Sequence, residues 1–173
     1  MGGISASTST NLLYGTNAYL TVNAIDIGAT LGDVEISWGV TQYFPDLAQA
    51  LGPVAGTGKV TEGMFSIGVT IAEWSWAILS ASLGSIGAVS TGDSYKFGGG
   101  ALANITEVSN VIVTGVTRND GKEFKATIAT AYVEVGNVTM SKGSETGLEL
   151  TFHGLYVVTT PSTMPGYIEI EKG

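Results

Sequence analysis

Two segments of the chain alternate apolar and polar residues at every second position. The runs DVEISWGVTQYF (residues 33–44) and MFSIGVTIA (residues 64–72) both follow this pattern. Successive side chains of a β-strand point to opposite faces, so a period of two is typical of a half-buried strand. A helical spacing appears only at residues 76–83, where Ser75 is a candidate N-cap and Gly84 follows the last helical position. We therefore expect a mainly β chain in which one short helix packs on a sheet.

The second half of the chain is almost wholly β in character. Residues 108–116 lead to the sequence Asn119-Asp120-Gly121, which favours the positive φ angles of a tight hairpin turn, and residues 124–135 supply the partner strand. No internal repeat or linker divides the chain, and its 173 residues suit one domain. Further strands are expected at residues 137–140, 147–155 and 167–171.

Two segments are expected to lie outside the regular sheet. Residues 1–24 are rich in Ser, Thr, Asn and Gly, so we expect an extended N-terminal arm before a single domain at residues 25–173. Residues 45–63 are expected to form one long loop between two strands, with a single turn near its start and glycines after it. Long loops in ordered domains usually bind something, and this composition suits another protein. The residues expected to make that contact are Asp46, Leu47, Leu51, Val54, Lys59 and Val60.

The composition excludes several classes of function. Seven Lys and Arg against fifteen Asp and Glu give a net charge of −8, which disfavours ordinary nucleic-acid binding. The absence of cysteine excludes disulfides and thiolate chemistry, and a single histidine disfavours a histidine metal centre, so no cofactor is expected. We expect neither a membrane helix nor a signal peptide. Only 13% of residues are charged against 44% hydrophobic, which predicts that much of the surface is buried in subunit contacts.

His153 and the glutamates of the C-terminal strands are the candidates for acid–base chemistry. By alternation His153 shares the polar side of its strand with Glu149, but no clustered carboxylate partner is near it in sequence. A surface or interface histidine is the better interpretation. In a hydrolase, two of these glutamates could pair as acid and base across a cleft, but a solvated strand face is the default because the sequence does not give the carboxyl separation. The glutamates concerned are Glu134, Glu145, Glu149, Glu169 and Glu171.

The tryptophans support a different hypothesis, a β-sandwich binding module that stacks a sugar ring on Trp38 or Trp74. Trp74 and Trp76 flank the start of the expected helix, where packing the helix on the sheet is the commoner use of such residues.

The order of these segments resembles the tail tube (major tail) proteins of long-tailed bacteriophages. The resemblance rests on the run IDIGATLGDVEI (residues 25–36), the long loop, the run FSIGVTIAE (residues 65–73) and the helix closing in Leu83-Gly84. Glu73 stands just before the helix, as an acidic residue often does in that family. The resemblance extends from about Ile25 to Ile170.

The resemblance implies a β-sandwich or distorted β-barrel flanked by one helix, assembled as hexameric rings that stack into a hollow tube. The protein would be a non-enzymatic virion component made in the host cytoplasm, with copies of itself and other tail proteins as partners. The loop at residues 45–63 would reach an adjacent ring, and DNA would pass through the lumen. An acidic lumen suits sliding DNA because it repels phosphate. Strand alternation makes Asp33, Glu134 and Glu149 the candidate lumen-facing acids. The alternative is a tail-tip or glycan-binding module.

Overall fold

The described part of the chain folds into one antiparallel β-structure with a single helix. The computed structural model describes residues 13–28, 30–45, 53–83, 89–91, 94–96, 107–117, 123–140, 142, 145–160 and 162–171. In chain order the elements are β1 (Leu13–Val22), β2 (Ile25–Asp26), β3 (Glu35–Tyr43), β4 (Lys59–Ile71), α1 (Trp76–Leu83), β5 (Val89–Thr91), β6 (Ser94–Lys96), β7 (Glu107–Thr117), β8 (Glu123–Thr139), β9 (Gly147–Gly154) and β10 (Gly166–Ile170).

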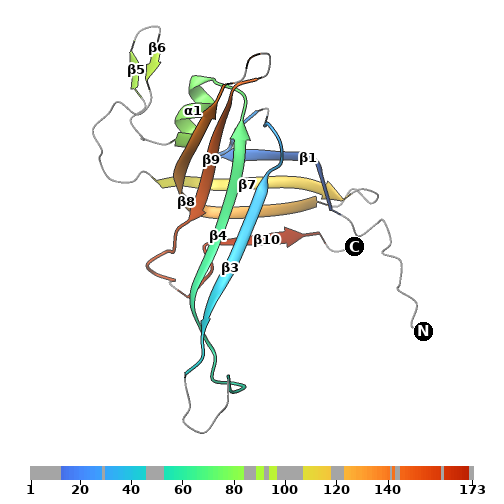
Figure 1. The fold of residues 1–173 in the computed structure, drawn as a ribbon, viewed down its shortest axis with the longest axis vertical. Coiled ribbons are helices and arrows are strands. Elements are labelled where there is room, and N and C mark those ends of the chain that lie inside the picture. The colour runs from blue at the N-terminus through green and yellow to red at the C-terminus, as the bar shows by residue number, and fades with distance from the viewer. Residues whose placement is uncertain are drawn as a thin grey trace, which may run out of the picture.

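The main sheet has eight strands in the order β2-β1-β7-β8-β9-β4-β3, and β10 also pairs with β8. Residues 124–128 of β8 pair with β10, whereas residues 131–139 pair with β9. Figure 1 shows β1, β7 and β10 running across the view while β3, β4 and β9 run along it. The two groups form crossed layers, and β8 passes from one layer to the other, as corner strands do in orthogonally packed sheets. The sheet does not close into a barrel. The expected mainly β, sandwich-like fold is therefore confirmed.

The corner between the layers coincides with Asn110, whose φ angle is 51°. Val108 and Val111 are both buried, although a regular strand would send these two side chains to opposite faces. On β8, which pairs with β7 here, Ile128 and Ala131 are likewise three residues apart and both fully buried. A left-handed residue at this point re-aims β7, and Asn adopts that conformation more readily than most residues.

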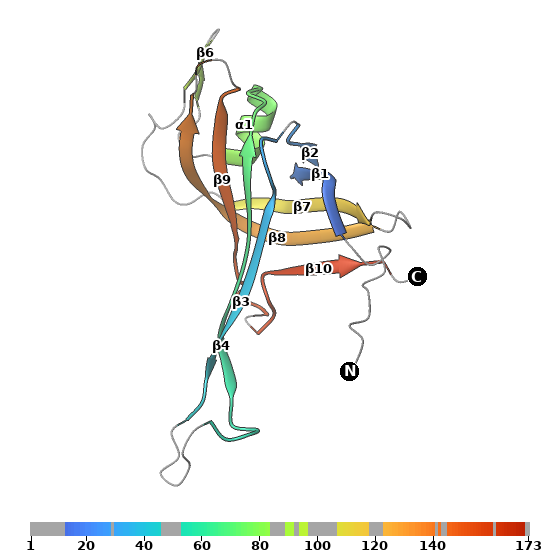
Figure 2. The same cartoon turned by 45° about the vertical axis from the view of Figure 1, so that its right-hand side comes forward.

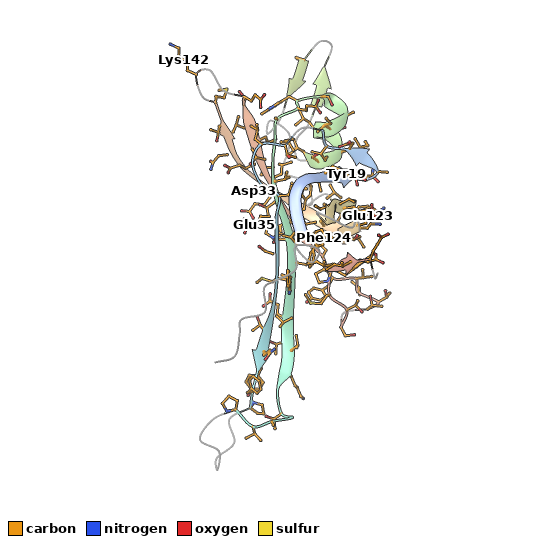
Figure 3. All side chains as sticks on the ribbon, turned by 90° about the vertical axis from the view of Figure 1, so that its right-hand side faces the viewer. Tyr19, Asp33, Glu35, Glu123, Phe124 and Lys142 are labelled. Carbon is orange, nitrogen blue, oxygen red and sulfur yellow. The ribbon has the colours of Figure 1, made fainter. Side chains whose placement is uncertain are left out.

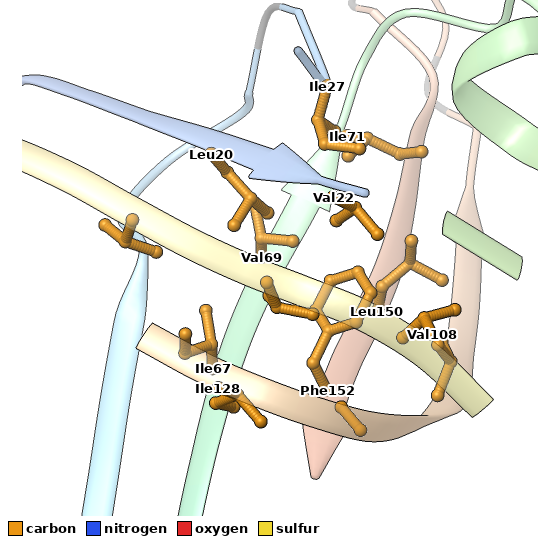
Figure 4. Packing of buried hydrophobic residues seen from close by; sticks show 14 of the residues in the cluster. Leu20, Val22, Ile27, Ile67, Val69, Ile71, Val108, Ile128, Leu150 and Phe152 are labelled. Carbon is orange, nitrogen blue, oxygen red and sulfur yellow. The ribbon is translucent and has the colours of Figure 1, made fainter. Parts of the chain in front are cut away.

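The core lies between the two layers (Figure 4). Phe152 of β9 is fully buried and packs with aliphatic side chains of both layers. Helix α1 contributes Leu79 and Leu83 to the same cluster. Ser75 caps the helix as expected, since its Oγ accepts a hydrogen bond from the Ile78 N–H at 3.2 Å. The other buried members include Leu20, Val22, Ile27, Ile67, Val69, Ile71, Val111, Val113, Ile128 and Leu150.

The expectation of an N-terminal arm up to residue 24 is wrong for residues 13–22. These residues form β1, which pairs with β7 and buries Leu20 and Val22 completely. The strand was missed because its polar, glycine-containing composition leaves only two apolar side chains in register. The domain therefore includes β1 and begins before residue 25, while residues 1–12 lie outside the described part of the chain.

Two further expectations change in detail. Residues 137–139 belong to β8 and do not form a separate strand, because a register shift between Val135 and Val138 interrupts the ladder without ending it. The expected hairpin between residues 108–116 and 124–135 is confirmed by the pairing of β7 with β8, although its turn at residues 118–122 lies outside the described residues.

Glu73 and Gly28, two residues of the family resemblance, lie against each other. Gly28 has a φ angle of 75°, and a Cβ atom there would collide with the Glu73 carboxylate. The positive φ angle favours glycine at this position, and the Glu73 carboxylate would have to move aside for any other residue.

The role of β1 predicts the effect of Leu20→Ala. Removing this fully buried side chain should lower the free energy of unfolding by about 2–5 kcal/mol, because it leaves a cavity between the layers. Tyr19→Ala is the matched control, since Tyr19 precedes it on the solvent side and should cost less than about 1 kcal/mol. Denaturant unfolding measures both, and equal effects would place β1 outside the core.

The left-handed corner predicts a second pair of variants. Asn110→Ala should destabilise the fold by about 1 kcal/mol, because alanine disfavours this conformation. Asn110→Gly should retain wild-type stability or exceed it. Thermal unfolding tests the order, and an alanine variant as stable as the glycine variant would remove the conformational role of Asn110.

Candidate assembly surfaces

A two-stranded hairpin projects from one end of the molecule. Strand β9 pairs with β4 only from Ser66 to Ile71, whereas β3 stays paired with β4 as far as the Tyr43–Lys59 pair. Residues 38–43 and 59–65 therefore extend past the end of β9, and we call them the hairpin arm. Figures 1 and 2 show the arm leaving the body of the sandwich. An isolated two-stranded hairpin is marginally stable in water, so an arm of this kind needs additional contacts.

The hairpin arm exposes large apolar side chains. Trp38 is 65% exposed and Val60 is 62% exposed. By pairing with Phe65, Trp38 lies on the core side of the sheet, as alternation predicts, but it is not buried. Alternation shows on which face of the sheet a side chain lies, but not whether other residues cover that face. Exposed apolar side chains that gather in one place are typical of surfaces that contact another molecule. Val40, Tyr43, Phe44 and Met64 are exposed on the same arm or at its end.

The expected loop at residues 45–63 is shorter than predicted. Lys59 and Val60 are strand residues of β4 that pair with Tyr43 and Gln42. This part of the strand was missed because residues 59–62 are exposed on both faces, so their sequence has no apolar side. Val54 is half-buried, and its carbonyl accepts hydrogen bonds from Thr57 N–H at 3.2 Å and Thr57 Oγ1 at 2.8 Å. The other predicted contact residues, Asp46, Leu47 and Leu51, lie outside the described residues.

Tyr156 anchors the base of the hairpin arm. Its hydroxyl accepts a hydrogen bond from Gly63 N–H at 2.7 Å and donates one to the Gly63 carbonyl at 2.8 Å. Gly63 is buried, and the Met164 sulfur lies where a Cβ atom would stand. The hydroxyl thus forms the hydrogen bonds that the backbone of β4 would otherwise lack just beyond the end of β9. No sequence pattern indicated this contact, because the partners are 93 residues apart.

A hollow of about 530 Å³ opens beside this anchor. It lies where the hairpin arm leaves the body of the sandwich. Its walls include Trp38, Glu62, Met64, Tyr132, His153 and Tyr156.

The outward face of the β3-β4-β9-β8 layer is acidic. The cross-strand register places Glu35 and Glu134 in one row, with Gly68 and Thr151 between them. Glu149 lies two residues before Thr151 on β9, so its side chain is on the same face. Leu150, between them, is buried on the opposite face. The structure thus brings two of the three predicted acids, Glu134 and Glu149, to one surface. Sequence alternation had already put Glu35 on the polar side of its strand, but that glutamate was not among the predicted acids.

The third predicted acid, Asp33, is exposed just before β3 begins. Figure 3 shows Asp33 and Glu35 near each other, with Lys142 at the end of the molecule away from the hairpin arm. In this layer β3, β4, β9 and residues 131–139 of β8 contain one lysine, Lys59 on the hairpin arm, and no arginine, whereas Lys125 of β8 pairs with β7 and β10 in the other layer. The outward face therefore carries a net negative charge, which we call the acidic face.

His153 also lies on the acidic face. Its Nε2 is 2.8 Å from Glu134 Oε2, and its ring stacks on Tyr132 with centroids 4.8 Å apart and an interplanar angle of 17°. The carboxylate partner was missed because it is 19 residues away and meets the histidine only through the pairing of β8 with β9. Ser66 is the cross-strand neighbour on the other side. The imidazole turns towards β8, and no hydrogen bond joins His153 to Ser66, both of which the structure describes.

Glu149 makes one polar contact. Its Oε2 accepts a hydrogen bond from Asn137 N–H at 3.4 Å, at the register shift of β8.

Within the described ranges, no three histidine or carboxylate side chains gather as a metal site. No helix in the described part of the chain has the length and apolarity needed to cross a membrane.

The sequence matches no protein-family model, and a comparison with curated proteins also gives no match.

The anchor at Gly63 predicts the effect of a single methyl group. Gly63→Ala should destabilise the protein by about 1–3 kcal/mol, because the new Cβ would overlap the Met164 sulfur and crowd the Tyr156 hydroxyl. Gly39→Ala is the control, since the nearest atom to its Cβ would be Met64 Cε at 4.0 Å. Thermal unfolding followed by tryptophan fluorescence measures both. Equal stability of the two variants would contradict the anchor.

Proposed function

We propose that the protein is a structural, non-enzymatic tail tube subunit of a long-tailed bacteriophage, which assembles into stacked rings around a DNA-conducting lumen. The observation that carries this proposal is the hairpin arm with its apolar side chains in solvent. A free monomer gains nothing from extending two strands past its core. Neighbouring subunits would bury these side chains and supply the contacts that the arm lacks.

The position of the hairpin arm favours stacking. It leaves one end of the molecule, and in the proposed tube it contacts a surface of another copy that differs from the arm itself. Such head-to-tail contacts build rings where they close and filaments where they do not. The contact made by an arm that reaches from one ring to the next does not close, so it would extend the assembly into a tube.

The acidic face gives the assembled tube its proposed chemistry. Glu35, Glu134 and Glu149 would line the lumen and repel the phosphates of passing DNA. Lysine or arginine there would bind DNA through release of counterions and hold it in place. Small neighbours such as Gly68 and Thr151 keep the wall smooth between the carboxylates.

A glycan-binding module remains the second candidate, because Trp38 is exposed beside the hollow. Trp74 is the other tryptophan of this hypothesis; it is 40% exposed, and its Nε1 donates a hydrogen bond to the Thr146 carbonyl at 3.1 Å. The module hypothesis requires sugar-dependent quenching of Trp38 fluorescence in the monomer, abolished by Trp38→Ala. A glycan panel without any response would remove it.

The proposal predicts that the hairpin arm controls tube growth. Purified protein should form rings or tubes in negative-stain micrographs, and Val60→Asp should abolish tubes without changing the melting temperature of the monomer. Val158→Asp is the control, because Val158 is 92% exposed but belongs to the connection between β9 and β10 and to neither strand of the arm, and it should assemble normally. Tubes formed equally by both variants would contradict the role of the arm. A wild-type protein that stays monomeric even with its tail partners would contradict the function.

The acidic face predicts where introduced positive charge would hold DNA. Tubes of the double variant Glu35→Lys/Glu149→Lys should retain short double-stranded DNA that is protected from nuclease and released as salt increases. The variant Glu123→Lys/Glu169→Lys makes the same change of charge on the other layer, where any bound DNA should be digested. Equal protection in both variants would show that the acidic face does not line the lumen.

A further inference from the structure

The hollow at the base of the hairpin arm opens on the acidic face. Its lining includes one cross-strand row of that face, made by Ser37, Ser66, His153 and Tyr132. The next outward pair along the arm is Gly39 with Met64, and both also line the hollow. Gly39 has no side chain, and the nearest atom to an added Cβ would be Met64 Cε at 4.0 Å. The floor of the hollow is therefore open at this point.

Aromatic and apolar groups form the walls of the hollow. Met64 is 61% exposed, so its thioether side chain is free to contact a ligand. The Tyr132 ring is held by stacking on His153, and the Tyr156 ring by the two hydrogen bonds of its hydroxyl with Gly63. Both rings are thus in place before any ligand binds. Aromatic rings attract organic cations as well as apolar groups, and the volume lies in the range of about 300–1,000 Å³ that is typical of small-molecule sites.

Three carboxylates surround the hollow. Glu62 lines it directly, and the Glu62 side chain has no hydrogen bond or ion pair with the rest of the described chain. The other two lie against lining residues: Glu35 Oε1 accepts a hydrogen bond from Ser37 Oγ at 3.4 Å, and Glu134 Oε2 is 2.8 Å from His153 Nε2. No lysine or arginine lines the hollow. Its charge is therefore negative, even when His153 is protonated.

The carboxylates stand at opposite ends of the hollow. Glu35 and Glu134 belong to the row beyond Ser66, whereas Glu62 lies four residues from Ser66 in the other direction along β4. At ~3.3 Å per residue, this places Glu62 about 13 Å from that serine. The apolar part of the hollow, at Met64, lies between the two ends. A compact metal ion is too short to contact both ends, and a neutral sugar leaves the carboxylates without a counter-charge.

We propose that the hollow binds a linear organic polycation of the polyamine class. One ammonium group pairs with Glu62, and another pairs with Glu35 or Glu134 at the opposite end. The methylene chain between them packs on Met64 and on the edge of the Tyr132 ring. This site goes beyond the proposed tube function and does not rest on it, because all of its residues belong to one subunit. In an assembled tube, the bound cation would reduce the negative charge of the acidic face.

Equilibrium dialysis with labelled spermidine tests the site, because it measures binding to monomer and to assembled protein alike. At physiological ionic strength, the wild-type protein should bind one spermidine per subunit in a saturable manner. Glu62→Gln and Glu35→Gln should each weaken binding about threefold, which corresponds to one exposed ion pair, and the double variant about tenfold. Glu123→Gln/Glu169→Gln is the matched control, since it removes the same charge from the other layer, and its affinity should equal that of the wild type.

A second variant fills the hollow without changing its charge. Gly39→Leu places a side chain in the open space above the floor, at a position in β3 whose φ angle is not positive. This variant should lose saturable binding of spermidine and keep the melting temperature and circular dichroism spectrum of the wild type. Gly39→Leu protein that is folded and binds spermidine with wild-type affinity would overturn the proposal.

Competition experiments separate this site from general attraction to an acidic protein. Unlabelled spermidine should displace the label, whereas Mg²⁺ at the same ionic strength should displace much less, because it has no apolar chain. Equal displacement by Mg²⁺, or equal weakening in the Glu123→Gln/Glu169→Gln control, would overturn the proposal and show that only surface charge is involved. Displacement by a neutral sugar would also overturn it and would support the glycan-binding candidate. The absence of saturable binding would remove the site and leave the tube function standing.

Discussion

The fold depends on a single shared strand pair. Strands β7 and β8 turn a corner together at Asn110, and β8 then serves as a strand of both crossed layers. Because one pair of strands links the layers, the core residues on both sides are held in fixed register with one another. The hairpin arm and the acidic face both belong to the second layer, so their positions relative to the body follow from this corner.

The sequence predicts those parts of the fold in which the buried residues recur with a regular spacing. Strand β4 was expected because Phe65, Ile67, Val69 and Ile71 are buried on one side, and helix α1 because Ser75 caps it. Strand β1 was missed, since its two buried residues stand among polar ones. The start of β4 was missed for the opposite reason, because residues 59–62 are exposed on both faces and their sequence does not alternate.

The candidate surfaces were predictable to a similar degree. Alternation places Glu134 and Glu149 on the polar side of their strands, and the structure puts both on one face. The contacts that depend on pairing between distant segments, His153 with Glu134 and Tyr156 with Gly63, left no local signal. The exposure of Trp38 was likewise hidden, since a strand that outruns its core keeps the alternation of a buried one.

The Tyr156 hydroxyl has a consequence for which strands are able to join the sheet. By bonding both backbone groups of Gly63, it occupies the place that an incoming strand would need beside the hairpin arm. The gap left where β9 stops is therefore closed to a stray extended chain unless that chain first displaces the tyrosine. One side chain thus acts as edge protection on β4.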